Sequence, residues 1–90
     1  MTSKNLEEIR LELDKIDHEM AILFESRLNL VAKVREIKMA ESLPILDAKR
    51  EEKVIAQNLA YIHDPKHIEL YKEFIIKVME ISRSLQEEKK

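Results

Sequence analysis

Apolar residues recur every three or four positions along most of this chain, which is the spacing of one face of an α-helix. The first such series, called the long seam below, consists of Leu6, Ile9, Leu13, Ile16, Met20, Leu23, Arg27, Leu30, Val34 and Ile37. A second, shorter series contains Val54, Ile55, Leu59 and Ile62, and a third contains Ile68, Tyr71, Ile75, Val78, Ser82 and Leu85. The pattern predicts an all-α protein with one long helix and two shorter ones.

The residues between these series set the predicted helix boundaries. Pro44 ends the first helix, because proline disfavours the helical conformation in the residue before it. Asp47 is a good N-cap for the second helix, and Asp64 with Pro65 supplies an N-cap and first residue for the third. The predicted helices cover about 6–42, 47–62 and 65–87, within a single domain of residues 1–90.

The first predicted helix is too long for the rest of the chain to cover. About 37 residues rising about 1.5 Å each form a rod of about 55 Å. A compact domain of this chain length has a radius of gyration of only about 12 Å. We therefore expect self-association, most simply as a two-fold homodimer in which the long helices pack together.

Composition removes several classes of function. The chain has no glycine, which excludes a dinucleotide-binding fingerprint, a phosphate-binding loop and a nucleophile elbow. It has no cysteine, which excludes disulfides, thiolate zinc sites and a cysteine nucleophile. A net charge of −2 gives no basic footprint for nucleic acid or an anionic membrane. No stretch resembles a signal peptide or a membrane span, so we expect a cytoplasmic protein.

Arg27 is the one charged residue in the long seam. Burying an unpaired charge costs several kcal/mol, so Arg27 either reaches solvent, pairs with a carboxylate, or binds an anionic ligand. Lys38 lies three turns further on and points nearly the same way, about 16 Å along the axis. Arg10 lies about 26 Å from Arg27 in the other direction. Only the Arg10 of an antiparallel partner chain can therefore join the other two.

Further polar residues gather at the second and third predicted helices. Asp47, Arg50 and Glu51 mark the start of the second, where free backbone N–H groups can bind oxygen ligands. Ser82 and Gln86 are one turn apart on the third, although Ser82 taken alone is better explained as a small residue that eases helix packing. The set is rich in donors but lacks an activated nucleophile, which suits the binding of a compact dianion rather than covalent catalysis.

We expect no metal site. His63 and His67 have the spacing of metal ligands, but the helix start at Asp64 and Pro65 separates them. No other cluster of histidine and carboxylate residues stands out.

Four stretches, "IRLELDKID", "ESRLNLVAKVREIK", "PILDAKREEKVI" and "ISRSLQ", together resemble the all-helical chorismate mutases of the AroQ class, also called type II. No stretch is specific alone, but their order and spacing match over nearly the whole chain. The resemblance implies an intertwined homodimer of three-helix chains with two active sites, each built from both chains. It also implies conversion of chorismate to prephenate, on the route to phenylalanine and tyrosine, without a cofactor or metal.

The resemblance further implies catalytic roles for four residues. Arg27 and the partner chain's Arg10 would bind the two carboxylates of chorismate. Lys38 and Gln86 would donate hydrogen bonds to the ether oxygen whose bond to carbon breaks.

Four more residues would bind the substrate by the same resemblance. Glu51 and the backbone near Asp47 would hold the ring hydroxyl, while Arg50 and Ser82 would complete the surroundings of a carboxylate. Some family members associate with the enzyme of the first step of the shikimate pathway, so such a partner is possible here.

Three alternatives remain open at this stage. An isochorismate-pyruvate lyase shares the fold and the cationic pocket, although Glu51 directly after Arg50 favours the mutase. A helical dimerisation module without catalytic activity would explain the long seam, but not the combination of Arg27, Lys38 and Gln86. The chain can also be the mutase domain of a bifunctional enzyme.

Overall fold

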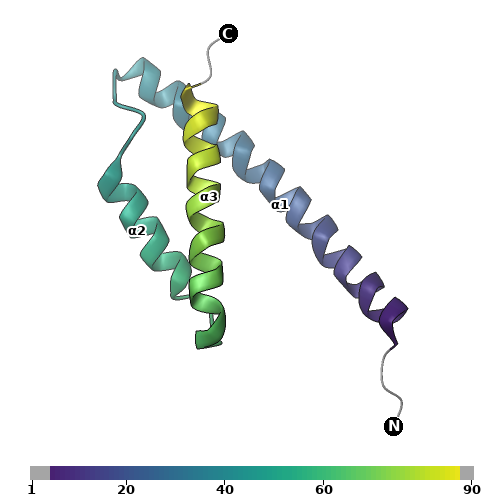
Figure 1. Cartoon of the computed structure of the whole chain (residues 1–90). Coiled ribbons are helices and arrows are strands. Elements are labelled where there is room, and N and C mark those ends of the chain that lie inside the picture. The colour runs from purple at the N-terminus through teal and green to yellow at the C-terminus, as the bar shows by residue number, and fades with distance from the viewer. Residues whose placement is uncertain (1–4, 88–90) are drawn as a thin grey trace. The chain divides into compact units, whose positions relative to one another are not determined.

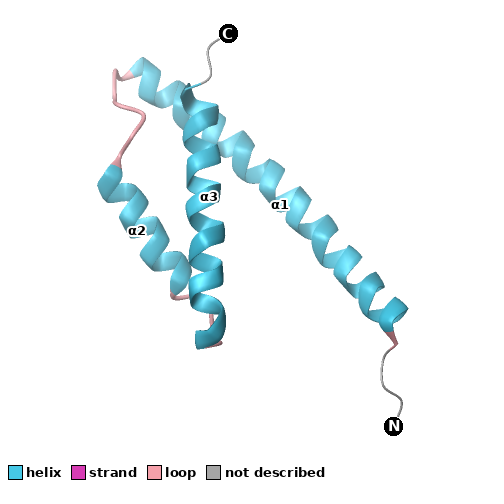
Figure 2. Cartoon of the chain, viewed as in Figure 1, coloured by secondary structure: helices cyan, strands magenta, loops and turns pink. Residues whose placement is uncertain are grey.

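The computed structural model describes residues 5–87, and every regular element in that range is helical (Figures 1 and 2). The elements are α1 (Leu6–Ala40), α2 (Ala48–Leu59), the 3₁₀ turn η1 (Pro65–His67) and α3 (Ile68–Glu87). The predicted all-α architecture with one long and two shorter helices is therefore confirmed. Residues 1–4 and 88–90 of the predicted single domain lie outside the described residues.

The chain divides into two compact units between Leu30 and Val31, inside α1. Among the described residues, the first unit consists of the N-terminal part of α1. The second unit contains the C-terminal part of α1 together with α2, η1 and α3.

The start of α1 is capped by Asn5. The backbone N–H of Glu8 donates to Oδ1 of Asn5 at 2.9 Å, which satisfies one of the amide groups that has no partner within the helix. Glu7 and Glu8 lie in the first turn and Lys38 in the last. The charges at both ends therefore interact favourably with the helix dipole and stabilise the helix.

The end of α1 is a Schellman motif, and it comes two residues before the predicted Ser42. The N–H of Leu43 donates to the carbonyl of Lys38 at 2.8 Å, and the N–H of Ser42 donates to the carbonyl of Met39 at 3.3 Å. This motif requires a left-handed residue, and Ser42 has a φ of 56°. Glycine is the usual residue there, but this sequence has none. The helix thus stops through its own capping motif before Pro44 can limit it.

Asp47 is the N-cap of α2, as predicted, because its Oδ1 accepts from the N–H of Arg50 at 3.0 Å. The helix ends at Leu59, earlier than the predicted residue 62. The N–H of Ala60 still donates to the carbonyl of Ala56 at 3.3 Å, but the following amides make shorter-range bonds: the N–H of Tyr61 donates to the carbonyl of Asn58 at 3.1 Å, and that of Ile62 to the carbonyl of Leu59 at 3.2 Å. These contacts tighten the chain into a turn.

The third predicted helix begins as η1 before continuing as α3. Oδ1 of Asp64 accepts from the N–H of Lys66 at 2.9 Å, and Pro65 is the first residue of the turn. The predicted start at Asp64 and Pro65 is therefore correct, with one turn of 3₁₀ geometry ahead of the α-helix.

Helices α2 and α3 lie side by side and run in opposite directions (Figure 1). A small polar network accompanies their packing, in which the Tyr71 hydroxyl donates to Oδ1 of Asn58 at 3.1 Å. Nδ2 of Asn58 in turn donates to the carbonyl of Val54 at 2.8 Å. Across residues 5–87, the buried side chains are Val54, Ile75, Val78 and Ser82.

The long seam remains exposed in the single chain. Helix α1 contains no buried residue, and the apolar side chains of the seam range from 42% exposed at Val34 to 68% at Leu23. A series of exposed apolar side chains of this kind is typical of an interaction site. No helix within residues 5–87 is long and apolar enough to cross a membrane.

The left-handed Ser42 gives a test of the α1 terminus. Ser42→Gly removes the steric penalty of a side chain at positive φ, so it should raise the free energy of unfolding by about 0.5–1 kcal/mol. Urea denaturation at a fixed protein concentration measures this change, with Ser42→Ala as the matched control because alanine keeps the penalty. A destabilising Ser42→Gly would contradict the described geometry.

Candidate active site

Six of the eight predicted site residues belong to the second unit, and two belong to the first. The first unit carries Arg10, which is exposed, and Arg27, which is half-buried. The second unit carries Lys38 at the end of α1, Asp47, Arg50 and Glu51 around the start of α2, and Ser82 and Gln86 on α3.

The ammonium group of Lys38 is fixed by a backbone contact. Its Nζ donates to the carbonyl of Ile45 at 2.6 Å, which ties the last turn of α1 to the segment that leads into α2. Both residues are half-buried. A lysine ammonium has three donors, so this contact holds the charged group in place and leaves donors for a ligand.

The start of α2 uses its polar groups in different ways. The Asp47 carboxylate caps the helix, and the backbone carbonyl of Asp47 accepts from the N–H of Glu51 at 3.0 Å. The helix cap therefore engages the side chain of Asp47. Arg50 is exposed, whereas Glu51 is half-buried.

Ser82 is buried, with 5% of its surface exposed. Its hydroxyl donates to the carbonyl of Val78 at 2.8 Å, one turn earlier in α3. Such a bond to the preceding turn satisfies a hydroxyl inside a helix. It supports the reading of Ser82 as a packing residue, since the hydroxyl proton already has an acceptor.

Gln86 lies one turn after Ser82 and is half-buried. Its side-chain Oε1 is buried and has no hydrogen-bond partner among the described residues. A buried acceptor without a partner costs about 1–3 kcal/mol. The Oε1 atom of Gln86 therefore remains an acceptor that no described residue satisfies.

Arg35, which the sequence analysis did not select, anchors the backbone of Gln86. Its Nε donates to the Gln86 carbonyl at 2.8 Å, linking α1 to the last turn of α3. The final carbonyls of a helix have no partner within it and commonly accept bonds from basic side chains. An arginine one turn before Lys38 was the only signal for this contact in the sequence.

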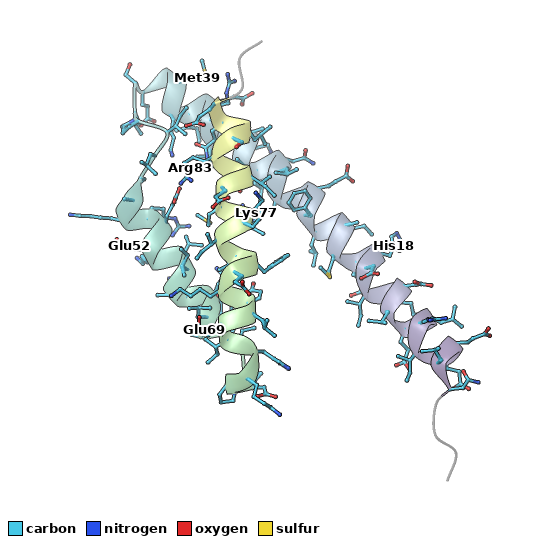
Figure 3. The ribbon with its side chains drawn as sticks, in the orientation of Figure 1. His18, Met39, Glu52, Glu69, Lys77 and Arg83 are labelled. Carbon is cyan, nitrogen blue, oxygen red and sulfur yellow. The ribbon has the colours of Figure 1, made fainter. Side chains whose placement is uncertain are left out.

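Arg83 is the second residue that the sequence analysis missed. One of its terminal nitrogens, Nη1, donates to both carboxylate oxygens of Glu51, at 2.9 Å to Oε1 and 3.0 Å to Oε2. Figure 3 labels Arg83 on the side of α3 that faces α2. Arg83 lies inside "ISRSLQ", but no local pattern shows that its partner is a residue 32 positions earlier.

The second unit thus combines ammonium, guanidinium and amide donors with the ion-paired carboxylate of Glu51. Over residues 5–87, no group of three or more histidine or carboxylate side chains is arranged to hold a metal ion. The donors suit an anionic, oxygen-rich ligand.

Comparison with protein families shows which family the chain belongs to. The pattern of the chorismate mutase type II family matches residues 9–87. The chain belongs to that family. The resemblance stated from the sequence is therefore confirmed, and the matched range contains all eight predicted site residues.

A conserved hypothetical protein from Pyrococcus furiosus has a similar solved structure. It is 32% identical, with a TM-score of 0.74, and the alignment covers 94% of this chain and 99% of that chain. The curated proteins contain no match to this chain. The two folds are thus similar along nearly the full length of both chains.

Proposed function

We propose that this chain is a chorismate mutase, which converts chorismate to prephenate by a Claisen rearrangement. The observation that carries the proposal is the type II family match over residues 9–87, which contains every residue that the resemblance assigns to the site. The donor-rich chemistry of the second unit supports it independently.

The reaction suits a site without a nucleophile. A pericyclic rearrangement needs the enolpyruvyl arm of the substrate folded over the ring, which is a problem of positioning. It also gains from donors directed at the ether oxygen, where negative charge develops as the bond breaks. We assign this role to the ammonium of Lys38 and the amide of Gln86. A glutamine donates without first having to be protonated.

The two carboxylates of chorismate require cations. We assign them to Arg27 and Arg10, with Arg50 completing the surroundings, because a guanidinium can form paired hydrogen bonds to a carboxylate. The resemblance also assigns Ser82 to the surroundings of a carboxylate, although its hydroxyl donates to the carbonyl of Val78.

The ring hydroxyl of the substrate requires an acceptor. We assign this role to the carboxylate of Glu51, together with the backbone near Asp47. Each carboxylate oxygen has more than one acceptor position, so the contact with Arg83 leaves room for a hydroxyl.

The functional unit is a homodimer in this proposal. The exposed apolar side chains of the long seam supply the interface, because their burial by a second copy is strongly favourable. Arg10 and Arg27 are separated by about 26 Å along α1. A substrate as compact as chorismate cannot bridge that distance, so the Arg10 at each site comes from the partner chain.

Incubation of the purified protein with chorismate, followed by chromatography, tests the activity. We expect prephenate as the product. Arg27→Ala should lower kcat/KM at least about 10²-fold, the scale of a lost electrostatic donor. Lys53→Ala is the control, because Lys53 is an exposed cation on α2 outside the proposed site.

The products also separate the alternatives. No conversion at high protein concentration would overturn the proposal and favour a dimerisation module. Salicylate and pyruvate from isochorismate would identify a lyase instead. Unchanged activity in Arg27→Ala would mean that the carboxylate-binding residues are elsewhere.

The proposed role of the Gln86 amide predicts how kcat/KM should depend on pH in a variant at this position. Gln86→Glu can donate to the ether oxygen only when its carboxyl is protonated, so kcat/KM should fall about 10²-fold as the pH rises from acidic to neutral. The wild type should show no such loss. The matched control is Gln57→Glu, the same substitution at an exposed position of α2. A Gln86→Glu profile that parallels the wild type would exclude Gln86 as the donor.

A further inference from the structure

The ion pair between Arg83 and Glu51 joins α3 to the first turn of α2 (Figure 3). The side chains are only 29% and 21% exposed, respectively. Nη1 of Arg83 lies at nearly equal distances from both oxygens of Glu51, 2.9 and 3.0 Å. Partial burial and double contact distinguish this pair from the exposed pair of Lys77 and Glu80, whose atoms are 3.5 Å apart.

Glu51 belongs to the proposed site, and Arg83 lies close in sequence to two further residues of it. Glu51 follows Arg50, and its N–H is bonded to the carbonyl of Asp47. Arg83 directly follows Ser82 and lies three residues before Gln86. The pair therefore connects the part of α2 proposed to hold the ring hydroxyl with the part of α3 that carries the amide donor.

A glutamate on a helix surface has three side-chain torsions and can adopt many orientations. A guanidinium that contacts both carboxylate oxygens restricts these torsions and sets the direction of the remaining acceptor positions. Such restriction lowers the cost of binding, because less side-chain freedom is lost when the ligand arrives. The same contact leaves acceptor capacity on the carboxylate.

We infer that Arg83 is a positioning residue, which orients the carboxylate of Glu51 toward the ring hydroxyl of the substrate. This inference rests on the proposed chorismate mutase function. Arg83 itself does not touch the substrate in this account. Arg83 affects only how well Glu51 binds the ring hydroxyl of the substrate. A residue that merely held α2 against α3 would have no such selective effect.

The test compares two substrates, chorismate and an analogue in which the ring hydroxyl carries a methyl group. In the wild type, chorismate should have the higher kcat/KM. Arg83→Met should reduce the ratio of the two kcat/KM values at least about 10-fold, by lowering the value for chorismate and leaving that for the analogue. Adding Glu51→Gln to Arg83→Met should change the ratio little further, because both substitutions disable the same contact, that of Glu51 with the ring hydroxyl.

Two further variants keep the test decisive. Arg83→Lys retains a cation but lacks the guanidinium, so it should give an intermediate ratio, and it suffices if Arg83→Met does not fold. Arg35→Met is the matched control: it removes another arginine contact to α3, and it should affect both substrates equally. Thermal unfolding of each variant measures any loss of stability.

The outcomes separate the two proposals. A wild type that converts neither substrate overturns the proposed function, and the role of Arg83 with it. A wild type that converts chorismate while Arg83→Met and Arg83→Lys keep the wild-type ratio overturns the positioning role alone. Equal losses for both substrates in the Arg83 variants would likewise reduce Arg83 to a structural contact.

Discussion

Burial of the long seam is the constraint on which this molecule depends. Helix α1 is 35 residues long and has no buried residue in the single chain. Complete burial of each large apolar side chain is worth about 1.5–3 kcal/mol, so several such residues along one helix give a strong driving force for association. In the proposed homodimer, a second copy of the chain presents the same seam and meets this requirement through two-fold symmetry.

Arg27 is the one charged residue in the long seam, and it relates the proposed dimer to the proposed substrate binding. An arginine at position 27 weakens a purely apolar interface, because a buried charge needs a partner. In the proposed dimer, the substrate's carboxylate is one partner of Arg27. The same helix carries Arg10 about 26 Å from Arg27. In the proposal, the length of α1 therefore accounts both for the dimer and for the need of each site for an arginine from the partner chain.

The second unit holds its polar groups through contacts between elements. Lys38 is fixed by the carbonyl of Ile45, the backbone of Gln86 by Arg35, and Glu51 by Arg83. Groups held in this way need little rearrangement when a ligand binds, which is the condition for stabilising a transition state by preorganised donors. The sequence predicted the helices and their caps at Asp47 and Asp64, because those signals are local. It did not predict the early end of α1, since a serine in the left-handed conformation has no distinct pattern. It also missed Arg35 and Arg83, whose partners are 51 and 32 positions away and are determined only by helix packing.

The most direct test of the shared site is to mix Arg10→Ala and Arg27→Ala homodimers and allow their chains to exchange. Each homodimer alone should be nearly inactive. A heterodimer should contain one intact site and one site lacking both arginines. Statistical exchange should therefore restore about a quarter of the wild-type activity. Native mass spectrometry can confirm the exchange. Recovery to this level would support a site built from two chains, whereas no recovery after confirmed exchange would contradict it.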